Sequence, residues 1–313
     1  MNLRENFKAY DLCPCQSGLK VKFCCGGASK KRWNKAPALV QVRPIPVKDY
    51  AHRKCYASLT TKCSETISSE HYISHNILKQ SEYKKAVQIT GLPWINYETW
   101  RRVPIKNLAA NILCENHNQA LSKLDAQMGR FFRTILNFDE DFNRDAPKEE
   151  LAVFSGEDIE KWMLKTVCGM VASCQLAMQG EKNDVPLKRE WVDILYHNHS
   201  WPEHWGMYFK VPKGRTINIF KSISVQPLTG AGELKAVEFS INEFKFNLIL
   251  GKPDKPWDCG RYRPRTMIFY QKGVKKYIEI CWQNNAYQSQ VDLKRIGTTA
   301  SEPPDWEPWM KRE

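Results

Sequence analysis

The chain lacks any long apolar run. Its longest nearly uncharged stretch, Thr166 to Gln179, falls short of the ~20 apolar residues that span a bilayer, so we expect no integral membrane protein. The first residues, MNLRENFKAYDLC, contain neither an apolar leader segment nor a small-residue cleavage site, which argues against secretion. We therefore expect a cytoplasmic protein with no membrane partner.

Three common catalytic signatures are also missing. The sequence contains no phosphate-cradling glycine loop, no G-x-S-x-G nucleophile turn and no dinucleotide-binding fingerprint. These absences argue against the nucleotide-dependent and serine-hydrolase classes that carry them. With 313 residues, 42% of them hydrophobic, the chain is still long and apolar enough for two or three globular units.

Acidic residues are scarce relative to basic ones. Lys plus Arg number 47 and Asp plus Glu number 34, which gives a formal net charge of +13. Residues 1–54 alone contain twelve basic and three acidic residues. This surplus favours a nucleic-acid partner, because Lys and Arg that contact phosphates release condensed counterions; a solvated surface is the alternative. The candidate phosphate contacts of this segment are Lys30, Lys31, Arg32 and Lys35.

The chain has eleven cysteines, which without an export signal are more often metal ligands or buried thiols than disulfides. Seven of them fall within the first 114 residues. The other four are scattered among apolar neighbours, and we expect them in the core: Cys168, Cys174, Cys259 and Cys281.

The first cluster has a C-x-C-x8-C-C spacing, formed by Cys13, Cys15, Cys24 and Cys25. Two close pairs of thiolates suit a tetrahedral Zn²⁺ site, and the metal would supply folding energy that so short a segment cannot gain from a core. The segment CPCQSGLKVKFCCG resembles the SEC-C motif, with Gln16 where that family usually has Gly. The resemblance implies a zinc knuckle within residues 1–30 that contacts a protein partner. A basic linker or arm, residues 31–54, follows it.

A second cluster begins at Cys55. Cys55 and Cys63 can supply one pair of metal ligands, and Cys114 with His117, three residues apart on one helix face, can supply the other. His52 is an alternative to Cys55 as the first ligand. Segment 66–74 alternates as a strand does, and apolar residues at helical spacing predict a helix over about residues 115–133. The residues of that stripe are Leu121, Leu124, Met128, Phe131 and Phe132.

Two short motifs in this region resemble the HNH endonuclease family. Residues 70–74, EHYIS, are similar to its strand motif E-H-[IV]-x-[PS], and residues 113–118, LCENHN, to its helix motif L-C-x-x-[CH]-[NH]. The resemblance implies a ββα-metal core over residues 55–138. It also implies that His71 is the general base and that Glu70 and Asn118 hold a catalytic cation. The middle asparagine of the family signature corresponds to Asn107 or Asn111.

The chemistry of phosphodiester hydrolysis matches these residue types. A base that works near neutral pH must activate water, and histidine has an unperturbed pKa of ~6.5. Charge that develops on the phosphate must be neutralised, and the oxygens of Glu70 and Asn118 are the hard ligands that Mg²⁺ or Mn²⁺ prefers. Zn²⁺ held by four Cys and His ligands has no open position, so each of the two expected zinc ions would be structural.

The rest of the chain reads as a separate unit. Residues 139–150 are acidic and loop-like, which predicts a domain boundary, and a core-packing helix follows with Glu157 and Asp158 in its first turn. From residue 205 onward, short alternating segments predict a mostly antiparallel sheet. Arg261, Arg263 and Arg265 alternate there; they would share a strand face and contact phosphates, or form an exposed basic edge strand.

These features together predict an α+β protein with a zinc knuckle, a ββα-metal core, and a C-terminal domain (residues 150–313) of one leading helix and antiparallel strands that recognises the target. The expected function is a divalent-metal-dependent HNH-type endonuclease acting on DNA or RNA, with DNA favoured, in a bacterial or phage-defence setting. Two alternatives remain: a non-catalytic zinc adaptor that binds nucleic acid or protein, and a chaperone-docking protein similar to SecA.

Overall fold

The computed structural model describes most of the chain. The described residues are 7–15, 18–24, 37, 39–45, 50–95, 99–177, 185–209, 215–217, 221–251, 261–271, 273–283 and 288–295. Several predicted site residues lie outside them: Cys25, Lys30, Lys31, Arg32 and Lys35. Among the described residues, no helix is long and apolar enough to cross a membrane.

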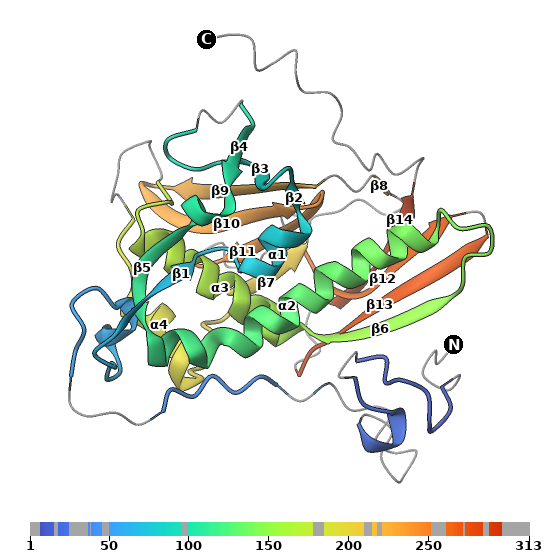
Figure 1. Cartoon of the computed structure of the whole chain (residues 1–313), viewed down its shortest axis with the longest axis horizontal. Helices are drawn as coiled ribbons and strands as arrows, with labels where there is room; N and C mark the ends of the chain where they lie inside the picture. The colour runs from blue at the N-terminus through green and yellow to red at the C-terminus, as the bar shows by residue number, and fades with distance from the viewer. Residues whose placement is uncertain are drawn as a thin grey trace.

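The fold is mixed α+β, as the sequence predicts (Figure 1). The described helices are α1 (His75–Gln80), α2 (Glu115–Asp141), α3 (Gly156–Ala172) and α4 (Arg189–His197). The strands up to residue 209 are β1 (Ile67–His71), β2 (Glu82–Tyr83), β3 (Ala86–Thr90), β4 (Arg101–Pro104), β5 (Ala109–Cys114), β6 (Glu150–Ser155) and β7 (Gly206–Phe209). The later strands are β8 (Arg215–Ile217), β9 (Ser222–Gly230), β10 (Glu233–Ile241), β11 (Phe244–Ile249), β12 (Arg263–Gln271), β13 (Val274–Cys281) and β14 (Gln288–Arg295).

Strands β1 and β5 form a two-stranded antiparallel sheet, and α2 begins at the residue after β5. The register places Ile67 opposite Cys114 and His71 opposite Ala109. The predicted strand over 66–74 is therefore confirmed as β1. Helix α2 extends well past the predicted end at residue 133, because Ile135 and Phe138 continue its buried apolar stripe.

A seven-stranded sheet joins early and late parts of the chain. Its order is β2-β3-β9-β10-β11-β7, and β4 pairs with β3 at one side. The link is the parallel pairing of β3 with β9, which places Ile89 opposite Ile223. One continuous hydrophobic core extends from Val42 to Trp282, so residues assigned to the predicted 55–138 and 150–313 units pack together.

A second sheet has five strands in the order β6-β13-β12-β14-β8. Only β12 and β13 pair antiparallel; the other three pairings are parallel. The predicted antiparallel pairing is present among β7, β9, β10 and β11 and between β12 and β13, whereas β6, β8 and β14 join the five-stranded sheet in parallel, which the prediction did not include. The predicted loop over 139–150 is shorter than expected, since α2 runs to Asp141 and β6 begins at Glu150.

Helix α3 passes through the centre of the molecule, as Figure 1 shows, and contacts α2, α4, β7 and β11. Its first turn is capped by Ser155, whose hydroxyl accepts a hydrogen bond from the backbone N–H of Asp158 at 3.1 Å. Nearly every residue of the helix is buried, including Lys161 and Lys165. Each buried ammonium needs a polar partner within the protein: Lys161 donates to Asn198 Oδ1 at 2.5 Å, and Lys165 pairs with Glu70 and Asp125.

Residues 39–45 of the predicted linker form an extended segment bound to the core. The Val40 N–H donates to Asp158 Oδ1 at 3.0 Å, and the Asn116 side chain exchanges two 2.8 Å hydrogen bonds with the Ile45 backbone. Val42 is completely buried between these anchors. This segment therefore packs against the protein and is not a free arm.

The N-terminal knuckle lies against β6. The Val153 N–H donates to the Pro14 carbonyl at 2.8 Å, and Val153 shares a small apolar cluster with Cys13, Cys15 and Val21. Cys281 of β13 packs against the same cluster, so this predicted core cysteine lies at the contact between the knuckle and the five-stranded sheet.

Candidate active site and metal centres

The second cysteine cluster converges on one point at the base of the β1–β5–α2 unit. Cys55 and Cys63 come from the segment before β1, Cys114 ends β5, and His117 lies in the first turn of α2. Their ligand atoms all lie within 4.8 Å of one another, and all four side chains are buried. The predicted pairing of four ligands far apart in sequence is therefore present.

The distances in this cluster match a tetrahedral zinc site. His117 Nδ1 lies 3.3 Å from Cys55 Sγ, 3.8 Å from Cys63 Sγ and 3.1 Å from Cys114 Sγ. Zinc bonds of ~2.3 Å to sulfur and ~2.0–2.1 Å to nitrogen, at tetrahedral angles, separate the two ligand atoms by about 3.6 Å. The four side chains could therefore hold a zinc ion with little movement.

The structure also separates the two alternatives for the first ligand. The Cys55 thiol belongs to the cluster, whereas His52 Nδ1 accepts a hydrogen bond from the Lys54 N–H at 3.1 Å. Burial lowers the pKa of His117 to about 4, so its imidazole is neutral at neutral pH, as a metal ligand must be. The Tyr196 hydroxyl donates to the His117 carbonyl at 3.2 Å and ties α4 to this site.

The N-terminal knuckle brings a second set of thiols together. Cys13, Cys15 and Cys24 have their sulfur atoms within 4.8 Å of one another, and the Sγ atoms of Cys15 and Cys24 are 3.4 Å apart. Two sulfurs on a tetrahedral zinc would be about 3.8 Å apart. These three residues could hold a zinc ion, and the predicted fourth ligand, Cys25, is outside the described residues.

His71 ends β1; its side chain is half-buried, with the ring beside that of His75 and with Nε2 shielded from solvent. The two ring centroids are 4.9 Å apart. A hydrogen bond joins the His71 ring to the backbone of Ile105, and its Nε2 has no hydrogen-bond partner in the part of the chain that the structure describes. Burial lowers the pKa of His71, and the nearby His75 and Lys165 lower it further. The ring is therefore neutral at neutral pH and able to accept a proton.

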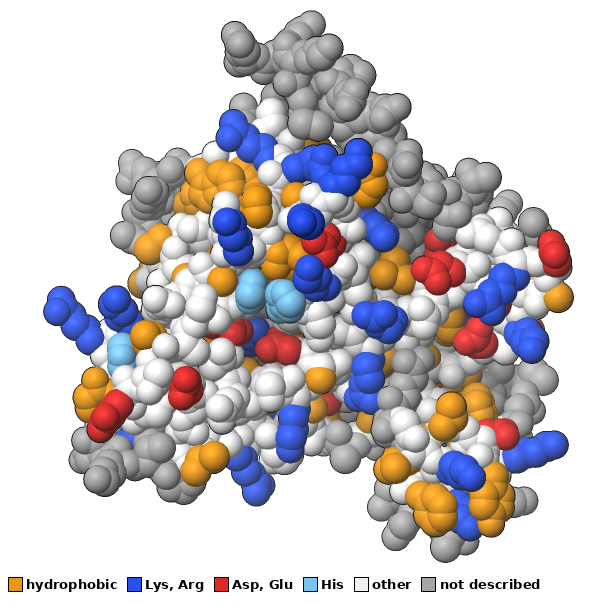
Figure 2. All heavy atoms as spheres, viewed as in Figure 1, with side chains coloured by type: hydrophobic (Ala, Val, Ile, Leu, Met, Phe, Trp, Pro, Cys, Tyr) orange, Lys and Arg blue, Asp and Glu red, His pale blue; other side chains and the backbone are white. Residues whose placement is uncertain are grey.

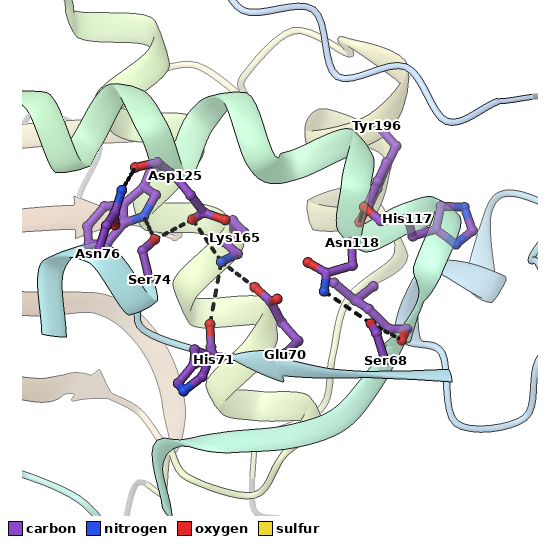
Figure 3. A network of polar contacts seen from close by, with 12 residues as sticks. Ser68, Glu70, His71, Ser74, Asn76, His117, Asn118, Asp125, Lys165 and Tyr196 are labelled. Carbon is purple, nitrogen blue, oxygen red and sulfur yellow. Dashed lines mark hydrogen bonds and ion pairs between the residues drawn. The ribbon is translucent and has the colours of Figure 1, made fainter. Parts of the chain in front are cut away.

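Glu70 points to the opposite side of β1, into a buried polar network (Figure 3). Lys165 of α3 is at its centre: the ammonium pairs with Glu70 and, at 2.9 Å, with Asp125 Oδ1 of α2, and it lies 3.5 Å from the His71 carbonyl. Burial opposes the charge on Lys165, but the two carboxylates more than offset it and raise the pKa to about 12. Burial raises the pKa of Glu70 against the pull of Lys165.

The network extends beyond these three residues. The Ser74 hydroxyl donates to Asp125 and accepts a hydrogen bond from Trp162 Nε1 at 2.6 Å. The chain after β1 is thereby fixed to both α2 and α3. Ser74 thus has a structural role here, since a side chain without a hydroxyl could make neither contact.

Asn118 lies near Glu70 on the first turns of α2. Its Nδ2 donates to Ser68 Oγ at 3.1 Å, and its hydrogen bond to Glu70 lowers the pKa of that carboxyl. Glu70 and Asn118 are therefore brought together, whereas the His71 ring lies on the other side of β1 and only the His71 carbonyl reaches the network. Asn107 and Asn111, the two candidates for the middle asparagine, are both exposed, the first after β4 and the second on β5.

Sequence reasoning missed Asp125 and Lys165. Asp125 follows Asn118 by seven residues, which is two helical turns and hence the same face of α2, so this residue could have been found. In the sequence, Lys165 is recognisable only as a charged residue within an otherwise apolar helix, which does not indicate its partners. Its contact with β1 depends on packing between segments 94 residues apart.

The predicted arginine row on β12 is wrong for Arg263. Arg263 is buried, its guanidinium stacks 4.7 Å from the Trp282 ring and lies 3.6 Å from Glu160 Oε2, and it donates to the Trp205 carbonyl at 3.2 Å. Arg261 precedes β12, and its Nε donates to Asn247 Oδ1 at 3.2 Å. Arg265 is exposed. The register shift between Pro264 and Thr266 breaks the alternation that the prediction assumed.

Comparisons with protein-family models, with curated proteins and with solved structures find no match for this chain. Its function must therefore be argued from the site itself.

Proposed function

We propose that the chain is an HNH-type nuclease that hydrolyses phosphodiester bonds in nucleic acid with His71 as general base. The observation that carries the proposal is the neutral His71 ring, whose Nε2 has no hydrogen-bond partner among the described residues, on a strand–strand–helix unit. Glu70 and Asn118 meet on the other side of β1, and four candidate metal ligands lie at the base of the unit. The motif resemblance led to the same residues, and their shared place on this unit supports the proposal.

In this proposal, His71 Nε2 takes a proton from a water molecule, and the resulting hydroxide attacks phosphorus. The bond from phosphorus to the leaving ribose oxygen breaks, and that oxygen takes up a proton from solvent. The hydrogen bond to the Ile105 backbone fixes the ring orientation so that Nε2 remains the accepting nitrogen. The lowered pKa of His71 keeps the base unprotonated before each turnover.

The residues present fit a hard divalent cation. Glu70 offers a carboxylate, and Asn118, whose amide group donates a hydrogen bond to it, carries an amide oxygen on the same side chain. Glu70 with Asp125 exceeds the charge of Lys165 by one negative unit. Bound there, Mg²⁺ or Mn²⁺ would neutralise charge on the phosphate and on the leaving oxygen. Lys165 fixes the Glu70 carboxylate, and it is a positioning residue in this account.

Zinc has a separate role in the proposal. The cluster of Cys55, Cys63, Cys114 and His117 offers four protein ligands and therefore has no position for water or substrate. It joins the segment before β1 to the end of β5 and the start of α2. Loss of this zinc would release the strand that carries His71.

One observation favours the alternative of a non-catalytic zinc adaptor. The Lys165 ammonium already pairs with Glu70, so the carboxylate has a cation without any bound metal. In an adaptor, the same network would be purely structural, and the protein would bind nucleic acid or a protein partner without cleaving it.

A cleavage assay separates the two functions. Purified protein is incubated with supercoiled plasmid and with RNA, each in Mg²⁺, Mn²⁺ or Ca²⁺. The nuclease proposal predicts cleavage in Mg²⁺ or Mn²⁺, and Asn118→Ala should cleave more slowly and recover in part as the metal concentration rises, because it weakens cation binding. If the wild-type protein, with its zinc in place, cuts neither nucleic acid in any metal, the adaptor function replaces the nuclease.

A further inference from the structure

Basic side chains gather beside the two surface histidines of the site. Figure 2 shows the histidine pair with Lys and Arg over the neighbouring β2–β4 region. Six exposed residues supply the charge, and we call them the basic hairpin: Lys79, Lys84, Lys85, Arg101, Arg102 and Lys106. Among the described residues of this region, 75–95 and 99–106, the only acidic side chain is Glu82, which pairs with Lys79 at 2.9 Å.

Strand pairing brings four of these residues to one end of the seven-stranded sheet: Lys84, Lys85, Arg101 and Arg102. Lys84 and Lys85 form the turn between β2 and β3, where Tyr83 is opposite Ala86. Ala86 is in turn opposite Pro104, the last residue of β4. The turn lysines therefore lie next to Pro104, at the end of β4, the strand that begins with Arg101 and Arg102. Lys106 follows Pro104 by two residues.

The same end of the sheet contacts the proposed base. The backbone of Ile105, directly after β4, receives the hydrogen bond of the His71 ring. The short helix α1, which starts at His75 and ends beside Lys79, packs on residues 105–108. Segments that carry the basic hairpin are thus in direct contact with His71.

The turn between β2 and β3 has an unusual composition for its shape. Lys84 has φ of 47° and Lys85 has φ of 62°, the left-handed region that Asn-Gly occupies at least cost in such two-residue turns. The Lys84 ammonium and the Arg102 guanidinium both lie against the Tyr83 ring, 5.1 and 5.2 Å from its centroid. The turn therefore carries two lysines although its backbone conformation is more easily adopted by uncharged residues such as asparagine and glycine.

We propose that the basic hairpin binds the phosphate backbone of the nucleic-acid substrate and brings a phosphate to His71. The inference rests on the proposed function and adds the surface by which the substrate docks. A polyanion would relieve the repulsion among six cations that have one acidic neighbour in the described segments 75–95 and 99–106. It would also lie beside His75, whose exposed ring is at the edge of the same surface.

The turn allows a variant that separates binding from folding. Lys84→Asn with Lys85→Gly removes two charges and inserts the residues that the turn conformation prefers, so the hairpin should be at least as stable as in wild type. The control, Lys148→Gln with Lys275→Gln, removes two exposed charges next to β6 and on β13 of the five-stranded sheet. Both variants therefore have the same net charge.

Binding is measured by fluorescence anisotropy with a labelled duplex DNA and a labelled duplex RNA, without Mg²⁺ or Mn²⁺, over a range of salt concentrations. Each lost contact with duplex DNA should lower the slope of log affinity against log salt by ~0.9, so the turn variant should lose nearly two units and the control none. Melting temperatures confirm that both variants are folded. The nucleic acid for which the slope falls more is the one that the hairpin contacts.

The outcomes separate this inference from the proposed function. If the turn variant keeps the wild-type slope with both nucleic acids, or if the control loses as much, the docking surface is refuted even where wild-type protein cleaves. If the turn variant loses slope but wild type cleaves nothing, the surface is supported and the nuclease function is not.

Discussion

Replacing Lys165 by methionine tests the buried network most severely. The Lys165 side chain is 1% exposed and Glu70 is 9% exposed, so removing the ammonium leaves the Glu70 carboxylate without its partner in a region that excludes water. Methionine has similar length, which minimises the cavity. Breaking one partner of a buried ion pair typically costs about 3–5 kcal/mol, because the remaining charge cannot be solvated. We expect Lys165→Met to destabilise the protein by this amount.

The assay is thermal unfolding at neutral pH. For a chain of this size, roughly 2 °C of melting temperature is lost per kcal/mol, so the melting temperature should fall by about 6–10 °C. The control is Lys235→Met, which removes an ammonium that pairs with Glu233 at 2.6 Å on the surface. That variant should have the melting temperature of the wild-type protein, because solvent screens the exposed Glu233 carboxylate.

A combined variant distinguishes a charge effect from lost packing. Lys165→Met with Glu70→Gln and Asp125→Asn leaves no charge in the network, so it should recover much of the lost melting temperature. If Lys165→Met melts no lower than Lys235→Met, or if the combined variant is less stable than the single one, the argument that Lys165 neutralises two buried carboxylates is refuted.

Three further predictions concern metal, backbone and pH. Elemental analysis of protein purified without chelator should give about two Zn per chain, and a wild-type value of one Zn would show that one cluster has been misread. Cys114→Ser should lose one zinc ion and unfold the core, whereas Cys24→Ser should keep the core folded. Gly91→Ala should destabilise the protein far more than Gly232→Ala. Both glycines have positive φ, but an added Cβ at Gly91 would lie 2.0 Å from the Val225 carbonyl oxygen, whereas at Gly232 it would meet no atom within 4 Å; equal melting temperatures would contradict this. Burial raises the pKa of Glu160 from 4.5 to about 7, against the pull of Arg263. Because the folded state therefore binds this proton more tightly than the unfolded state, the free energy of unfolding should fall by up to about 3 kcal/mol as pH rises from 4.5 through 7. Glu160→Gln should lack that part of the pH dependence in melting curves, and a slope equal to wild type would contradict it.

Local features of the sequence were enough to predict the elements next to the site. The strand at β1, the start of α2 and each of the two ligand pairs are set by residues close in the chain, and each is present. The core role of α3 also follows from its composition, and its capping by Ser155 agrees with acidic residues in the first turn.

Pairing between distant segments could not be predicted in the same way. β6 joins the five-stranded sheet through β13, more than 120 residues later in sequence, and Lys276 of β13 anchors that end through ion pairs of 2.6 Å with Asp141 and Glu150. The burial of Arg263 depends on Glu160 of α3, and the network around Glu70 depends on Lys165 of the same helix. An alternating pattern reports which face a residue occupies, but it does not report what packs on that face.

The central claim is that His71 is the general base of a nuclease. The most direct test compares plasmid cleavage by wild type, His71→Ala and His199→Ala, each with its zinc content and melting temperature measured; His199 is an exposed histidine after α4 and serves as the control. The account predicts that His71→Ala keeps its zinc and fold but cleaves ~10²–10⁴-fold more slowly, while His199→Ala cleaves like wild type. Cleavage by folded His71→Ala at the wild-type rate would contradict it.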